Sequence, residues 1–81
     1  MVNVKIYTAP NCPYCKALKK FLEKYRIPFE EIDVSKNPKA VTELILKSNQ
    51  AGVPVIEINK KVIVGFNRDA IIKALFIEEK H

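Results

Sequence analysis

The chain has 81 residues, of which 48% are hydrophobic and only 2 are glycine, which excludes a disordered chain and leaves room for one domain, residues 1–81. The net charge of +5 comes from lysines and arginines spread along the chain without a basic tail or an aromatic platform, so we expect no nucleic-acid partner. No apolar run approaches the roughly 20 residues that span a bilayer, and the N-terminus lacks a secretory signal, so we expect a cytoplasmic protein with no membrane partner.

The first predicted element is a strand. Val2, Val4 and Ile6 alternate with polar residues as far as Thr8, which is the period of a half-buried strand. The segment 9–11, Ala-Pro-Asn, then breaks the pattern.

A helical pattern begins at Pro13, because a proline loses nothing by lacking an N–H in a first helical turn. The apolar residues that follow recur at helical spacing and form one predicted inner stripe: Ala17, Leu18, Phe21, Leu22 and Tyr25. We expect this helix to end at Ile27-Pro28, and residues 29–34 to form a second strand.

A second helix is predicted to start with Asn37 as its polar cap and Pro38 in its first position. It would end at Gly52, and its predicted inner face consists of Val41, Leu44, Ile45 and Ser48.

Residues 53–58 and 61–64 predict two strands joined by a tight turn at Asn59-Lys60. Gly65 ends the last strand, and Asn67 can cap a final helix with an inner face of Ile71, Ile72, Leu75 and Phe76. The order β-α-β-α-β-β-α predicts an α/β fold, a four-stranded mixed sheet with helices on both faces.

The two cysteines of the chain, Cys12 and Cys15, could bind a metal, form a structural disulfide or perform redox chemistry. A zinc site needs four ligands, and His81 is the only histidine, so one chain is short of ligands. A structural disulfide would close too small a loop to stabilise much, and a reducing cytosol would open it. Reversible thiol–disulfide chemistry is therefore favoured. A noncatalytic module that holds a metal or an iron–sulfur cluster through cysteine thiolates stays open as the alternative.

The positions of the cysteines predict different roles. Cys12 stands just before Pro13, at the cap of the first helix, where free N–H groups and the helix dipole favour a thiolate, and Lys16 adds positive charge nearby. We therefore expect Cys12 to be the nucleophile. Cys15 lies one turn later and is more shielded, as a resolving thiol would be, while Pro13 and Tyr14 fix the geometry of the small ring.

Three motifs resemble glutaredoxin-like redoxins of the thioredoxin superfamily over nearly the whole chain. Cys-Pro-Tyr-Cys at 12–15 is similar to the dithiol glutaredoxin active site, and Gly-Val-Pro-Val at 52–55 resembles the segment with the cis-proline of thioredoxin-fold proteins. Val-Gly-Phe-Asn-Arg-Asp at 64–69 falls where these proteins turn into their last helix. The resemblance implies a minimal thioredoxin fold and a redox-active Cys12–Cys15 disulfide.

The resemblance also implies a substrate site. It places a cis bond before Pro54 and leaves the backbone of Val53 free to pair with an extended thiol substrate. Tyr14 would form a wall of the groove. Asn67 and Arg68, at the start of the last helix, would supply N–H groups and charge for the carboxylates of glutathione.

Two positions depart from glutaredoxins that use glutathione. Ala9 stands where many carry Lys or Arg, and Val64 stands where they usually have the first of two glycines. The segment after Val64 is closer to the NrdH-type redoxins, which serve ribonucleotide reductase and are typically reduced by thioredoxin reductase.

From the residues and the resemblance together, we expect a monomeric thiol–disulfide oxidoreductase with no bound cofactor or metal. Its substrates would be protein disulfides or glutathione-mixed disulfides, with ribonucleotide reductase among the targets. Its electron donor would be glutathione, as a co-substrate, or thioredoxin reductase.

Overall fold

The computed structural model describes residues 3–79, with side chains as far as Leu75. The elements in chain order are β1 (Val4–Thr8), α1 (Pro13–Lys24), β2 (Glu30–Asp33), the short 3-10 helix η1 (Val34–Lys36), α2 (Pro38–Ser48), β3 (Val55–Ile58), β4 (Lys61–Val64) and α3 (Arg68–Glu79). The predicted order is confirmed, with η1 as an addition. Within residues 3–79, no helix is long and apolar enough to cross a bilayer.

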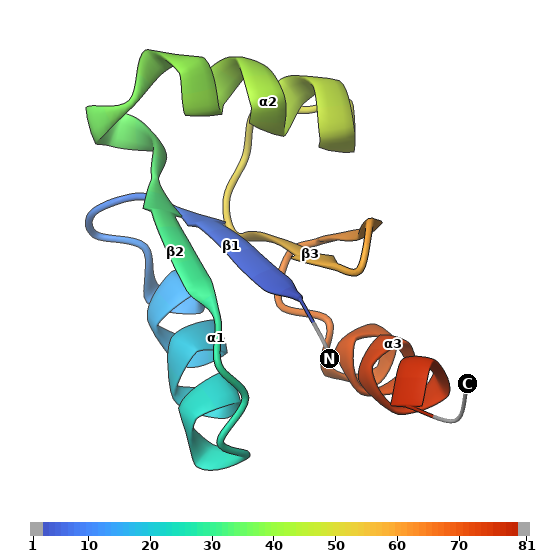
Figure 1. The fold of residues 1–81 in the computed structure, drawn as a ribbon. Helices are drawn as coiled ribbons and strands as arrows, with labels where there is room; N and C mark the ends of the chain where they lie inside the picture. Colours follow the sequence, from blue (N-terminus) through green and yellow to red (C-terminus); the bar gives the residue numbers. More distant parts are fainter. Residues whose placement is uncertain (1–2, 80–81) are drawn as a thin grey trace.

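The four strands form one mixed sheet in the order β2-β1-β3-β4 (Figure 1). β1 pairs with β2 in parallel and with β3 antiparallel, and β3 and β4 form the predicted antiparallel hairpin. Tyr7 lies opposite Val55, and Val55 lies opposite Val64, so the C-terminal end of β1 and the two outer ends of the hairpin meet at one edge of the molecule.

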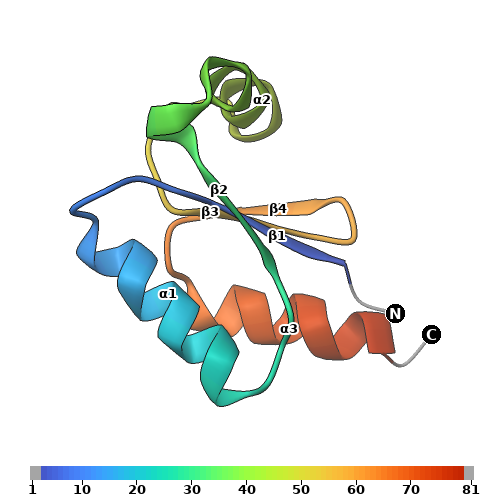
Figure 2. The same ribbon diagram turned by 60° about the vertical axis from the view of Figure 1, so that its left-hand side comes forward.

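Helices cover both faces of the sheet, as predicted. α1 and α3 lie on one face and α2 lies alone on the other (Figure 2). Because successive side chains of a strand point to opposite faces, Val4 and Ile6 face α1 and α3 while Tyr7 faces α2. The larger core, under α1 and α3, consists of Val4, Ile6, Leu18, Phe21, Leu22, Ile56, Ile58, Ile71, Ala74 and Leu75.

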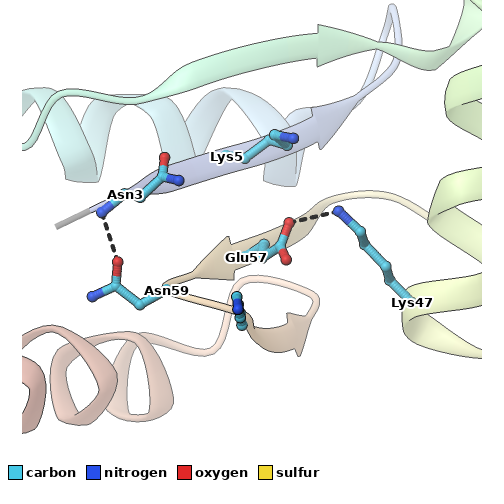
Figure 3. A pocket seen from close by; sticks show the side chains of 6 residues that line it. Asn3, Lys5, Lys47, Glu57 and Asn59 are labelled. Carbon is cyan, nitrogen blue, oxygen red and sulfur yellow. Dashed lines mark hydrogen bonds and ion pairs between the residues drawn. The ribbon is translucent and has the colours of Figure 1, made fainter.

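Among the described side chains, the smaller core under α2 contains three fully buried ones, Tyr7, Leu44 and Val55. A polar contact adds to it at the far end of α2. Lys47 Nζ donates to Glu57 Oε1 at 2.7 Å and to Tyr7 Oη at 3.1 Å, and Figure 3 shows Lys47 reaching across to Glu57. The hydrogen bond to Glu57 is the main reason that the pKa of Lys47 is raised above its ordinary value.

The end of α1 differs from the prediction. The helix ends at Lys24, before Ile27-Pro28, because Arg26 takes a left-handed φ of 56°. The N–H of Arg26 then donates to Glu23 O at 3.0 Å and that of Ile27 to Leu22 O at 2.9 Å, the paired bonds of a Schellman motif.

Several side chains and strand ends also differ. Tyr25, predicted on the inner stripe of α1, is half exposed and packs against the ring of Phe21 at a centroid distance of 5.0 Å. Ile45, predicted on the inner face of α2, is exposed, because only one narrow side of α2 contacts the sheet.

Strand β2 is shorter than predicted at both ends, and β3 begins at Val55 rather than at residue 53. The predicted positions of Val2 and of the Phe76 side chain lie outside the described part.

Candidate redox site

The cysteine loop, the start of β3 and the start of α3 lie at the same end of the sheet. β1 leads into the cysteine loop, and the pairing of Tyr7 with Val55 puts Pro54 beside the end of β1. Gly65 N–H donates to Pro54 O at 2.8 Å, which joins the segment before α3 to the segment before β3 (Figure 2). The three predicted motifs, at residues 12–15, 52–55 and 64–69, therefore meet at one end of the molecule.

Cys12 is the N-cap of α1, where the sequence predicts it. Asn11 has a left-handed φ of 60°, which turns the chain sharply before the helix, and Cys12 itself is extended with φ −109° and ψ 105°. Pro13 follows in the first helical position. The N–H of Cys15 donates to Cys12 Sγ at 3.2 Å, so the sulfur of Cys12 accepts one of the helix N–H groups that have no partner inside the helix.

The two cysteines form a disulfide, with Cα atoms 5.2 Å apart, within the usual 4.4–6.8 Å range. Their exposure differs sharply: Cys15 is 2% exposed, whereas Cys12 is only partly buried. Cys12 is therefore the more accessible residue of the pair, and Cys15 is shielded from a large partner.

The electrostatics of the first turn favour an anion on Cys12. The first turn of α1 contains no acidic residue, and the exposed Lys16 lies one residue after the pair. The positive end of the helix dipole and the donated N–H of Cys15 both stabilise a thiolate relative to a thiol at position 12.

Val53 and Pro54 are joined by a cis peptide bond, as the resemblance implies. Pro54 is buried and Val53 is partly buried against the smaller core. The main-chain N–H and C=O of Val53 have no hydrogen-bond partner within residues 3–79, so they remain available to another molecule.

The other predicted binding residues occupy the rim of this end. Tyr14 is 68% exposed. Asn67 caps α3, since its Oδ1 accepts from Ala70 N–H at 3.1 Å. Arg68 is exposed, and its guanidinium lies over the ring of Phe21 at 5.6 Å from the centroid, so it also connects α3 to α1.

Two groups near the site were missed by sequence reasoning. Gln50 binds the main chain of Gly52 through its side-chain amide, and no periodicity or motif signals such a contact.

The second group is at the end of β1. Buried Thr8 donates through Oγ1 to Glu31 Oε2 at 2.8 Å, and Lys19 Nζ lies 3.0 Å from the same oxygen. The hydrogen bond from Thr8 holds the pKa of Glu31 below its ordinary value, with a smaller contribution from Lys19.

Elsewhere, a hollow of about 370 Å³ lies at the opposite end of the sheet and contains none of the predicted site residues. Figure 3 shows it; its lining residues are Asn3, Lys5, Lys47, Glu57, Asn59 and Lys60. Nowhere in the described part do three His, Cys, Asp or Glu side chains gather where they could hold a metal ion, and His81 lies outside that part.

Comparison with known proteins agrees with this geometry. A family model described as glutaredoxin matches residues 4–63. A glutaredoxin-like 8.6 kDa protein of the rubredoxin operon of Clostridium pasteurianum is 42% identical over 72 residues, which cover 89% of this chain and 96% of that protein. Glutaredoxin 3 of Escherichia coli is 37% identical over 65 residues, covering 80% of this chain and 78% of that protein.

A solved structure is similar as well. The NrdH-redoxin of Escherichia coli, a glutaredoxin-like protein described as having a thioredoxin-like activity profile, superposes with a TM-score of 0.80 at 30% identity. The match covers 88% of this chain and 92% of that chain. The shared architecture, a four-stranded mixed sheet with three α-helices, is the thioredoxin fold.

Proposed function

Because this chain belongs to the glutaredoxin family, we propose that it is a thiol–disulfide oxidoreductase that reduces disulfides in other proteins through Cys12 and Cys15. The observation that carries the proposal is the asymmetry of the pair: one accessible sulfur at a helix start and one buried sulfur a single turn later. Such an arrangement suits a nucleophile followed by a resolving thiol.

The reaction moves two electrons from the dithiol to the target. The Cys12 thiolate attacks one sulfur of the target disulfide, the target S–S bond breaks, and the departing target thiolate takes a proton from water. Cys15 loses its proton to solvent and attacks Cys12 Sγ, which breaks the mixed disulfide and releases the second target thiolate. The target is then fully reduced and the Cys12–Cys15 disulfide is formed.

The substrate segment binds beside the pair in extended form. The main chain of Val53, which has no partner among the described residues, supplies one N–H donor and one C=O acceptor, so it recognises backbone with little selectivity for sequence. Tyr14, Asn67 and Arg68 line the approach. Lys16 and Pro13 act on Cys12 rather than on the substrate.

The physiological setting is part of the same proposal. The protein acts as a monomer in the cytoplasm, without a bound cofactor, in electron transport and cell redox homeostasis. Glutathione or thioredoxin reductase returns two electrons to the Cys12–Cys15 disulfide after each cycle, and glutathione-mixed disulfides are substrates too. Ribonucleotide reductase is among its protein targets, a proposal supported by the likeness to NrdH-redoxin.

Replacing each cysteine separately tests the proposal. Cys12→Ser should abolish reduction of a peptide disulfide while the protein stays folded, because serine is also a good N-cap. Cys15→Ser should still attack but stop at the mixed disulfide, which intact-protein mass spectrometry detects as an added target mass. Full reductase activity in Cys12→Ser would overturn the assignment.

A second measurement identifies the electron donor. Oxidised protein is incubated with NADPH and either glutathione plus glutathione reductase or thioredoxin reductase alone, and NADPH consumption is followed. Turnover only with glutathione would mean that Ala9 and Val64 are tolerated in a glutathione-dependent enzyme. Turnover only with thioredoxin reductase would make this an NrdH-type redoxin in function.

A further inference from the structure

Residues 51–52, in the segment that connects α2 to β3, are held by hydrogen bonds rather than by packing. Ala51 and Gly52 are exposed, so little burial fixes their conformation. Instead, the Gln50 side chain satisfies both polar groups of Gly52: Gly52 N–H donates to Gln50 Oε1 at 2.7 Å, and Gln50 Nε2 donates to Gly52 O at 3.0 Å. The Gln50 side chain thus supplies the two hydrogen bonds that a neighbouring strand would give to Gly52 in a sheet.

The amide of Gln50 is itself anchored to α2. Nε2 also lies 3.2 Å from Ser48 Oγ, and that hydroxyl is within donating distance of Leu44 O, at 2.6 Å, and of Gln50 O, at 2.9 Å. Asn49 takes a left-handed φ of 60° and turns the chain so that Gln50 can fold back. The position of Gly52 is therefore tied to the C-terminal turn of α2.

Val53 lies between two tethered residues. The residue before it, Gly52, is hydrogen-bonded to the side chain of Gln50. The residue after it, Pro54, accepts through its O from Gly65 N–H at 2.8 Å. The N–H and C=O of Val53 have no partner within residues 3–79. An exposed segment would otherwise lose conformational freedom when a substrate binds, and that loss weakens binding.

We infer that Gln50 is a positioning residue for disulfide substrates: by holding Gly52 it keeps the main chain of Val53 ready to pair with an extended substrate segment. The inference rests on the proposed function and adds a determinant of affinity to it. Gln50 contacts the main chain of Gly52 and the C-terminal turn of α2, and neither cysteine is among its hydrogen-bond partners, so its loss should affect binding rather than attack by Cys12.

The test separates binding from chemistry. Reduced protein is mixed in a stopped-flow instrument with increasing concentrations of a synthetic peptide that carries an intramolecular disulfide in an extended segment. Gln50→Ala should raise the half-saturating peptide concentration about tenfold and leave the saturating rate within about twofold of wild type. Leu46→Ala, an exposed residue on the outer side of α2, is the matched control and should change neither value.

A double-mutant cycle distinguishes the contact from general destabilisation. A Cβ added at Gly52 would lie 2.8 Å from Gln50 Oε1, and among the described residues, its two chain neighbours aside, Gln50 supplies the atoms that come within 4 Å of it. Gly52→Ala alone should therefore displace the amide and raise the half-saturating concentration. In a Gln50→Ala background the same substitution should add little, because the atom it meets is gone.

Folding is checked on every variant by circular dichroism at the assay temperature. If Gln50→Ala does not fold, Gln50→Glu replaces it. Glutamate keeps the acceptor for Gly52 N–H but loses the bonds that Gln50 Nε2 donates to Gly52 O and Ser48 Oγ. The half-saturating peptide concentration should then rise by less than in Gln50→Ala. An unchanged half-saturating concentration in folded variants, or strictly additive effects in the cycle, would overturn the inference. A wild-type protein that fails to reduce the peptide would instead overturn the proposed function, and the inference with it.

Discussion

Cys12 and Cys15 carry the same side chain three positions apart, and the backbone alone makes them different. Position 12 lies before the first helical turn, where the residue is partly exposed and its sulfur accepts the N–H of Cys15; position 15 lies inside the turn, where the residue is 2% exposed. Thr8 and Gln50 lie outside the three sequence motifs, and a single side chain also determines local structure at each of these positions. Each makes a side-chain hydrogen bond that fixes a neighbouring segment of the site.

Glu31 provides a prediction about pH. Thr8, and to a lesser degree Lys19, lower its pKa below the ordinary value of 4.5. The unfolded chain therefore binds this proton at higher pH than the folded chain, so the stabilisation is complete above about pH 4.5 and is lost as the pH falls through the folded pKa. Glu31→Gln should lose less free energy of unfolding than wild type between about pH 6 and pH 3, measured by urea denaturation.

Glu23→Gln is the matched control for that experiment, because Glu23 is an exposed carboxylate on α1. It should follow the wild-type pH dependence. If Glu31→Gln follows it as well, the ionisation of Glu31 contributes nothing to the pH dependence of stability.

Helices and strands in this chain end largely where a residue takes a left-handed backbone conformation. Within residues 3–79, five residues other than glycine do so: Asn11, Arg26, Asn49, Asn59 and Lys60. Three of them are asparagine, the residue that tolerates this region best after glycine. The turn between β3 and β4 has φ of 46° at Asn59 and 77° at Lys60, which is the pattern of a type I′ hairpin turn.

The second position of a type I′ turn favours glycine, so Lys60 is the unfavourable choice there. Lys60→Gly should raise the free energy of unfolding by about 0.5–1 kcal/mol, measured by urea denaturation, because relief of the left-handed conformation outweighs the added freedom of the unfolded chain. Lys61→Gly, one residue later inside β4, is the control and should destabilise instead. Equal effects of both substitutions would contradict this explanation.

The sequence predicted the elements better than their ends. Helical spacing identified the buried side of α1, and the polar caps at Asn37 and Asn67 were placed correctly. The end of α1 was missed because Arg26, not Pro28, reverses the chain, and arginine has no intrinsic tendency to do so. Ile45 was misplaced because apolar spacing does not reveal how narrow a contact the sheet offers α2.

The candidate site likewise has a part that the sequence predicts and a part that it does not. The motif Cys-Pro-Tyr-Cys and the cis bond at Pro54 could be anticipated from short sequence patterns. Gln50 could not, since a side chain that binds the main chain two residues later has no periodic signature. Such contacts depend on a loop conformation that only the folded molecule defines.

The two faces of the sheet are stabilised unequally. Of the side chains that the structure describes, ten buried ones form the core under α1 and α3, and three form the core under α2. The contact of Lys47 with Glu57 and Tyr7 ties α2 to the sheet by polar bonds near the surface. Local opening follows the region with the fewest buried apolar contacts, so α2 is the helix expected to separate first.

Native-state hydrogen exchange tests this expectation. Amides of α2 should exchange through a partial opening with a free energy below that of global unfolding, while those of β1 and α1 should exchange only on global unfolding. Lys47→Met, which removes the polar contact, should lower the opening free energy of α2 more than that of α1. A single free energy for all three elements would show that the molecule opens as one unit.

The three helices begin on caps of different quality. Asn37 starts α2 by accepting from Lys39 and Ala40, and Asn67 starts α3 by accepting from Ala70, whereas α1 starts on the sulfur of Cys12, a weaker acceptor than an amide or hydroxyl oxygen. A better cap at position 12 could not attack a disulfide. The proposed role of Cys12 as the nucleophile therefore explains why α1 begins on a weaker cap than α2 and α3.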